Sequence, residues 1–138
     1  MSRVYFTDRD LGKKFPELLR AAGLAVERHY DLFPPDGPDE QWLEHCGRKG
    51  RIAISHNVRI RYTPNELAAV LSHSVALLIV VGKAPYPELA ANFVSTATRI
   101  ERFLERHRAP FIAKVYRPSP EERKRDAEAA GSISLWYP

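Results

Sequence analysis

Hydrophobic and polar residues alternate along this chain in two patterns, one typical of strands and the other of helices. Short runs of β-branched and aromatic residues predict five strands, at residues 3–7, 25–29, 51–55, 75–81 and 111–116. Apolar residues that recur every three or four positions predict helices at residues 15–22, 39–47 or 39–50, 64–71 and 86–107. Strands that alternate with helices in this way predict an α/β fold with a parallel sheet.

The fourth predicted strand carries the clearest sign of that sheet. Val75 to Val81 is apolar at every position, as expected for a parallel strand covered by helices on both faces. The chain has 138 residues, enough for one domain with its own core. We therefore expect a single-domain α/β/α sandwich with a central, mainly parallel sheet over residues 1–118. Residues 119–138 are expected to form a charged C-terminal extension that ends in an apolar tail.

The longest predicted helix, residues 86–107, has one apolar stripe. Leu89, Phe93, Ile100 and Leu104 recur at three to four residues or multiples of that spacing. We expect this stripe to pack against the core.

Acidic and amide side chains stand where the predicted strands end. Asp8 and Asp10 follow the first strand, Asn57 follows the third, and Asp39 begins a predicted helix. The carboxyl ends of parallel strands meet in one crevice, where ligands bind. Carboxylates that meet there repel one another unless a cation lies between them. Oxygen ligands suit Mg²⁺ or Mn²⁺, so the pattern predicts a metal site.

The charge of the chain agrees with an anionic partner. Lys and Arg number 21 against 17 Asp and Glu, which gives a formal net charge of +4. Arg59 and Arg61 follow Asn57 and are candidates to hold substrate phosphates in bidentate fashion. A metal held by carboxylates in a basic protein suggests phosphodiester chemistry.

Other chemistries find less support. The sequence has neither a Gly-x-Gly-x-x-Gly motif nor a Gly-Lys-Ser/Thr motif, which disfavours a nucleotide-binding or other small-ligand fold. Its five histidines show no zinc-type pairing, and the lone Cys46 lies on the apolar face of a predicted helix. No apolar run approaches the roughly 20 residues of a membrane span. We expect a cytoplasmic protein without membrane contact.

Each candidate residue also has a purely structural interpretation. Asp8, Asp10 and Asp39 are common helix-capping residues, and Glu66 suits the first turn of a helix. Trp42 fits the core better than a base-stacking surface because of its helical spacing with Cys46.

Several motifs together resemble one known family. They are Asp8 after the first strand, Leu18-Leu19-Arg20-Ala21-Ala22-Gly23, Pro38-Asp39-Glu40-Gln41-Trp42-Leu43, Arg59-Ile60-Arg61 followed by Pro64 and Glu66, and the strand from Pro110 to Tyr116. With this spacing, residues 3–117 resemble the PIN-like domains of VapC-type toxins. The resemblance implies a parallel sheet between helices, a Mg²⁺- or Mn²⁺-dependent ribonuclease site of three or four acids, and a cognate antitoxin.

Carried over residue by residue, the family's acids fall on Asp8, Asp39 and Glu66. At the fourth position, where related sequences have Ser or Thr, one residue and then Asp, this chain has Asn57. An amide offers a carbonyl oxygen to a metal but brings no negative charge and accepts no proton. We expect this change to weaken both metal binding and activity.

The leading hypothesis is a metal-dependent endoribonuclease, the toxin of a toxin–antitoxin pair. Asp8, Asp39 and Asn57 would be metal ligands, and Glu66 a direct or outer ligand. The alternative is an inactive PIN-like module that binds RNA or a protein partner. Toxins of this kind are often homodimers, and apolar side chains near Phe93 or Trp136 would serve as the contact unless they belong to the core.

Overall fold

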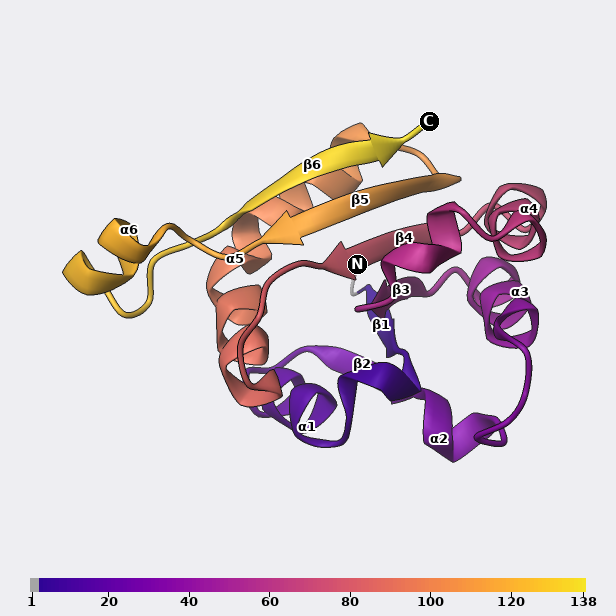
Figure 1. Ribbon diagram of the computed structural model, residues 1–138, viewed down its shortest axis with the longest axis horizontal. Coiled ribbons are helices and arrows are strands. Elements are labelled where there is room, and N and C mark those ends of the chain that lie inside the picture. Colours follow the sequence, from indigo (N-terminus) through magenta and orange to yellow (C-terminus); the bar gives the residue numbers. More distant parts are fainter. Residues whose placement is uncertain (1–2) are drawn as a thin grey trace.

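The computed structural model describes residues 3–138 and shows one six-stranded sheet between two layers of helices (Figure 1). The strand order is β2-β1-β3-β4-β5-β6, with the first five strands parallel and β6 antiparallel to β5. The strands are β1 Val4–Thr7, β2 Ala25–Arg28, β3 Ile52–Ser55, β4 Ala76–Val80, β5 Phe111–Tyr116 and β6 Ser132–Tyr137. The predicted α/β/α sandwich with a mainly parallel sheet is confirmed.

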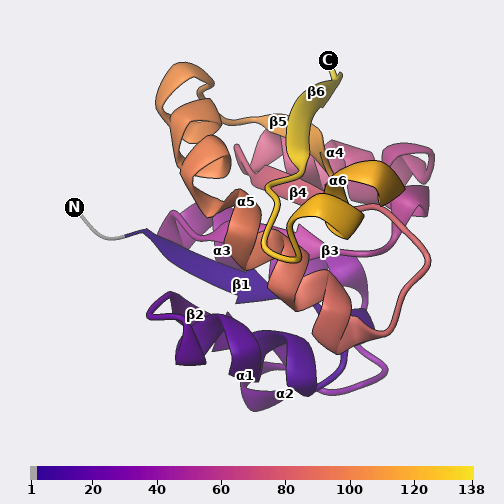
Figure 2. The ribbon, with the colours of Figure 1, turned by 90° about the vertical axis from the view of Figure 1, so that its left-hand side faces the viewer.

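Two helices cover each face of the sheet. Helices α1 and α5 lie together on one face, and α3 and α4 lie together on the other (Figures 1 and 2). The helices are α1 Lys14–Ala21, α2 His29–Leu32, α3 Asp39–Lys49, α4 Pro64–Ser72, α5 Tyr86–Arg106 and α6 Pro120–Arg125, with short 3₁₀ turns η1 Arg9–Leu11 and η2 Val58–Arg61.

Each face of the sheet has its own buried cluster, because successive side chains of a strand point to opposite faces. On β1, Tyr5 packs with Phe15 and Phe93 under α1 and α5. The next residue, Phe6, packs on the opposite face, where it stacks on Trp42 of α3 at 5.5 Å between ring centroids. The core position expected for Trp42 is confirmed.

The apolar stripe of α5 faces inward as predicted. Leu89, Phe93, Ile100 and Leu104 are all buried. Phe93 therefore belongs to the core and is not available as a dimer contact.

Helices α3 and α4 approach each other closely at Gly47. A Cβ atom at this position would lie 2.1 Å from the backbone oxygen of His73, so only glycine fits. Helix α3 then ends at Gly50, which adopts a left-handed conformation with φ of 68°. This close approach joins the last turn of α3 to the C-terminal end of α4.

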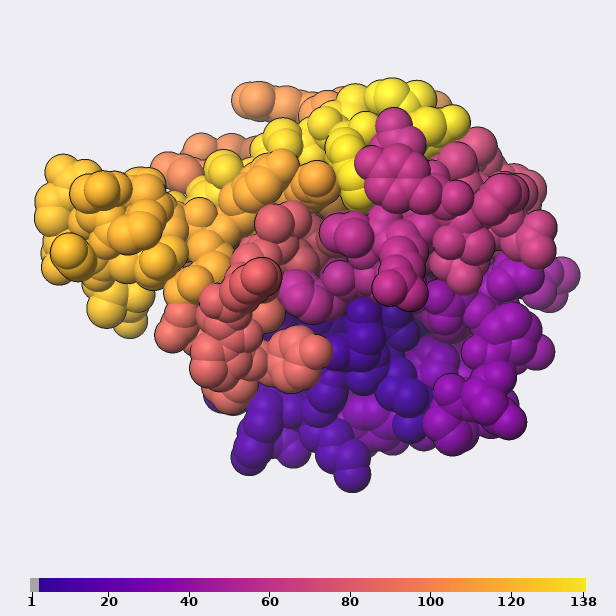
Figure 3. Space-filling view, viewed as in Figure 1, coloured from indigo at the N-terminus to yellow at the C-terminus, as the bar shows by residue number. Residues whose placement is uncertain are grey.

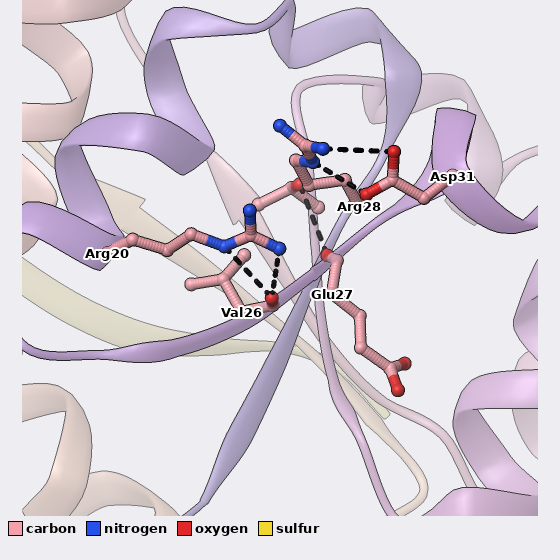
Figure 4. Close-up of polar contacts among 6 residues, drawn as sticks. Arg20, Val26, Glu27, Arg28 and Asp31 are labelled. Atoms are coloured by element: carbon pink, nitrogen blue, oxygen red, sulfur yellow. Dashed lines mark hydrogen bonds and ion pairs between the residues drawn. The ribbon is translucent and has the colours of Figure 1, made fainter.

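The outer strand β2 is fastened to its neighbours by polar contacts (Figure 4). Arg20 of α1 donates to the carbonyl oxygen of Val26 from Nε at 3.2 Å and from Nη2 at 2.8 Å. After the strand, Arg28 holds Asp31 with two hydrogen bonds of 2.7 and 3.0 Å. The strand ends at Arg28, one residue earlier than predicted, because the chain turns into α2 at His29.

The C-terminal residues join the same sheet. Residues 132–137, for which the sequence indicated only an apolar tail, form β6 and pair with β5. Helix α6 lies within the charged segment before it, as Figure 2 shows. Within residues 3–138 there is no helix with the length and apolar character needed to cross a membrane.

Candidate functional site

Two acids meet at the carboxyl ends of β1 and β3. The backbone N–H of Asp8 donates to Ile54 at 2.9 Å, which carries the pairing of the two strands one residue beyond β1. Ser55, the last residue of β3, has its Oγ 2.9 Å from Oδ2 of Asp8 and 3.3 Å from Oδ2 of Asp10. A hydroxyl has one proton and can donate to only one of them at a time. Ser55 therefore bridges two carboxylates that it cannot satisfy together.

Asp10 belongs to this acid pair and does not cap the first helix. The N-cap position of α1 is Lys13, while Oδ2 of Asp10 accepts the backbone N–H of His56 at 3.1 Å. Its other oxygen, Oδ1, is buried and has no hydrogen-bond partner among the described residues. A buried carboxylate oxygen without a donor is costly unless a cation or water reaches it.

The pKa values of Asp8 and Asp10 also indicate that the negative charges of the pair lack a compensating positive charge. Burial, the neighbouring charge of Asp10 and, more weakly, that of Asp39 raise the pKa of Asp8 to about 7, although the Ser55 hydrogen bond acts in the opposite direction. Burial also raises the pKa of Asp10. A divalent cation between the two carboxylates would remove their mutual repulsion and favour their charged forms.

Asp39 faces these acids from α3. It is the first residue of the helix, but the N-cap position is Pro38 and no side chain makes a capping bond, so the capping role expected for Asp39 is wrong. Instead, its Oδ1 accepts a hydrogen bond of 3.0 Å from the indole N–H of Trp42. Its charge is near enough to raise the pKa of both Asp8 and Asp10.

Glu66 lies in the first turn of α4. Burial, and then the charges of Asp39 and Glu40, raise its pKa. Its Oε1 is buried and, within the described part of the chain, accepts no hydrogen bond. Asp39 is thus within electrostatic reach of both the strand-end pair and Glu66.

Asn57 joins the site through its backbone. Its N–H donates to Oγ of Ser55 at 3.0 Å, while its side-chain oxygen accepts the N–H of Arg59 at 3.0 Å and caps η2. The amide oxygen is thereby engaged in a local turn next to the acids. That Asn57 binds a metal stays a prediction.

The two candidate phosphate ligands differ. Arg59 is exposed, and residues 3–138 offer its side chain no ion pair or hydrogen bond. Arg61 lies against the rings of Tyr62, Trp136 and Tyr137, with its Cζ 4.9 to 5.3 Å from their centroids. Arg59 is therefore the better placed of the two to reach a ligand.

These residues offer the oxygen donors that Mg²⁺ and Mn²⁺ prefer. Among residues 3–138, no three His, Cys, Asp or Glu side chains are arranged so that they form a complete metal site. Mg²⁺ does not require one, because it keeps several waters and is commonly held by one or two carboxylates together with substrate phosphates. Asp8 and the unpartnered oxygen of Asp10 fit that mode.

A comparison with known families identifies the fold. A family model described as a PIN-like domain matches residues 3–82, more than half of the chain and all of the acids above. The chain belongs to the PIN-like domain family. PIN domains are generally dependent on divalent metals and typically bind RNA. No curated protein and no solved structure shows significant similarity to the chain.

Ser55 was absent from the residues predicted to form the site. Its signal in the sequence is the Ser55-His56-Asn57 segment at the end of a buried strand. The structure gives Ser55 a central place because its hydroxyl contacts Asp8 and Asp10 and accepts from Asn57.

Proposed function

We propose that this protein is a metal-dependent endoribonuclease of the VapC type, the toxin of a toxin–antitoxin pair that acts on RNA in the cytoplasm. The observation that carries the proposal is the pair of the buried Asp8 and the half-buried Asp10, bridged by one serine hydroxyl at the carboxyl edge of a PIN-like sheet. Two neighbouring carboxylates whose pKa values are raised by burial are unfavourable for folding alone and are typical of functional sites.

In this proposal Asp8 and Asp10 hold Mg²⁺ or Mn²⁺, and Asp39 and Asn57 stand at the rim as further oxygen ligands. When bound, the ion supplies an activated water and offsets negative charge on the phosphate. Glu66 has a raised pKa and a buried oxygen without a donor, which suits it to orient a water of the ion as an outer ligand. Arg59 contacts a phosphate of the RNA backbone.

The alternative, a PIN-like module that has lost catalysis and binds RNA or a protein, has one observation in its favour. The position where related sequences carry Asp is Asn57, whose oxygen already caps η2. If a fourth charge is essential, the remaining acids hold the ion too weakly for turnover.

The test is cleavage of a labelled single-stranded RNA by the purified protein in Mn²⁺, Mg²⁺ or EDTA. We expect cleavage with either ion, none in EDTA, and a loss of at least about a hundred-fold in Asp8→Asn, about 2.7 kcal/mol of barrier. Asp36→Asn is the matched control, because Asp36 is an exposed carboxylate in the loop before α3. Equal cleavage by wild type and Asp8→Asn would show a contaminating nuclease and support the binding module.

The toxin assignment has a separate test. Induced expression in bacteria should arrest growth, and Asp8→Asn should relieve the arrest at the same level of protein. Normal growth with an active wild-type enzyme would remove the toxin assignment and leave the nuclease.

A further inference from the structure

A cluster of aromatic and cationic side chains lies beside the candidate site. It consists of Arg61, Tyr62, Lys114, Trp136 and Tyr137, which come from η2 and the residue after it, β5 and β6. Tyr62 meets Trp136 edge to face, with 5.8 Å between ring centroids. Lys114 Nζ lies 3.9 Å from the centroid of Trp136. We call these five residues the aromatic cluster.

The aromatic cluster carries positive charge and includes one exposed aromatic ring. Tyr62 is 68% exposed, more than any other large hydrophobic residue described as exposed, and Trp136 is half-buried. Across residues 3–138, neither Arg61 nor Lys114 has a carboxylate within ion-pair distance. The buried Nε of Arg61 has no hydrogen-bond partner in the same part of the chain. Two cations without carboxylate partners thus lie beneath an accessible aromatic surface.

Packing of β6 accounts for only part of this arrangement. Trp136 and Tyr137 contact the buried cluster under α3 and α4, so they help fasten the last strand to the sheet. That role does not require Tyr62 to stand in solvent, where a large apolar ring contributes little to folding. The exposed face of Tyr62 is the part that folding leaves unexplained.

The aromatic cluster lies within reach of a strand bound at the acids. Tyr62 directly follows η2, which begins after Asn57, and four residues at about 2.0 Å each span about 8 Å. This length corresponds to two or three stacked bases at the rise of about 3.4 Å that each strand of a duplex has. Figure 3 shows the segment after β1, the segment after β3 and part of β6 on one face of the molecule.

We propose that the aromatic cluster binds an unpaired base of a single-stranded RNA substrate, which stacks on Tyr62 beside Trp136 while Arg61 and Lys114 attract the adjoining phosphates. This inference rests on the proposed nuclease function, because it states how the substrate of that site is held. Stacking on an aromatic ring requires a base that is not paired in a duplex. The arrangement therefore selects single strands and accepts any base.

The first test measures binding without cleavage. In EDTA, the fluorescence anisotropy of a labelled 12-nucleotide RNA gives the Kd of wild type and of Tyr62→Ala. We expect Tyr62→Ala to weaken binding by about ten-fold, the effect typical of one stacked base. Tyr116→Ala is the control, because Tyr116 is an exposed tyrosine of β5 outside the cluster. Its Kd should stay within about two-fold of wild type, whereas equal Kd values for Tyr62→Ala and wild type would overturn the proposal.

The second test observes the cluster itself. The chain has two tryptophans, and Trp42 is fully buried, so RNA that reaches the cluster should quench the emission of Trp136. The quenching should disappear in Trp136→Phe, which keeps an aromatic ring in the cluster but removes the emission that reports on it. Quenching by duplex RNA as strong as by the single strand would contradict the proposal.

The two proposals fail in different ways. RNA binding that depends on Tyr62, with no cleavage in any metal, would remove the nuclease and keep the aromatic cluster as a binding surface. Cleavage that depends on Asp8, with binding unaffected by Tyr62→Ala, would keep the nuclease and overturn the role of the aromatic cluster.

Discussion

The acids of the site form two groups that differ in how the fold holds them. Asp8 and Asp10 follow a strand, are bridged by Ser55, and have raised pKa values caused mainly by burial. Asp39 and Glu66 belong to the first turns of two helices, and only Asp39 has a side-chain hydrogen bond, from Trp42. The strand-end pair is fixed by the sheet, whereas the helix pair depends on how α3 packs on α4.

In the proposed nuclease, this difference assigns the metal to the strand-end pair. Register between β1 and β3 places Asp8 and Ser55 together, and a shift of a single residue would separate them. The pair is therefore suited to hold a metal in one position. The helix acids are not fixed by the sheet, which suits them to outer contacts with the water of the ion.

Substitutions in the two groups of acids should differ most in their effect on RNA cleavage. We expect Asp10→Asn to reduce kcat/KM for RNA by about a hundred-fold, because it removes one of the two charges that hold the metal while keeping an oxygen for the N–H of His56. Glu66→Gln should reduce it by less than about ten-fold. A larger loss in Glu66→Gln than in Asp10→Asn would reverse the assignment of the two groups.

The second contrast is in stability against pH, measured without metal. Asp8 has a pKa of about 7 in the folded protein and about 4 in an unfolded chain, so the folded state binds the additional proton between these values. The free energy of unfolding should therefore fall as pH rises from 5 to 8, by on the order of 2 kcal/mol from this group. Denaturant titrations in EDTA at both pH values measure the fall.

Asp8→Asn isolates this contribution from that of other titrating groups. The variant should lose most of the decline and be more stable than wild type at pH 8. Identical slopes in the two proteins would show that Asp8 is not held uncompensated in the folded state.

The smallest expected effect concerns Asn57. Asn57→Asp keeps an oxygen to cap η2, since Asp is as good a cap as Asn, and adds a negative charge beside Ser55. We expect tighter Mn²⁺ binding by calorimetry and about ten-fold faster RNA cleavage, about 1.4 kcal/mol of barrier. In the Asp8→Asn background the gain should vanish. Unchanged binding and cleavage would mean that position 57 does not face the metal.

The spacing of apolar residues along the sequence was sufficient to predict most of the fold. The apolar run of β4 and the stripe of α5 predicted buried elements because burial alone decides their pattern. The pairing of β6 with β5 was not predictable in this way. Its residues 132–137 are half-buried or exposed, and their place follows from pairing with β5 and from contacts with residues such as Arg61, which are distant in sequence.

The sequence predicted where the site residues lie along the chain but not which groups their side chains contact. Strand ends located Asp8 and Asn57, since topology decides where strands end. Asp39 was expected to cap a helix and instead accepts a hydrogen bond from Trp42. For Asp10 the sequence left both a cap and a place in the acid cluster open, and it shares Ser55 with Asp8. A short polar side chain chooses between its own backbone and a neighbour according to tertiary packing, which sequence spacing does not specify.

The most direct test of the metal site is anomalous diffraction from a crystal soaked in Mn²⁺. Our account predicts a peak at the carboxyl ends of β1 and β3, about 2.0 to 2.3 Å from a carboxylate oxygen of Asp8 and of Asp10. The formerly unpartnered Oδ1 of Asp10 should lie among its ligands. A structure with Mn²⁺ bound elsewhere, or with none bound and Ser55 still bridging the two acids, would contradict the account.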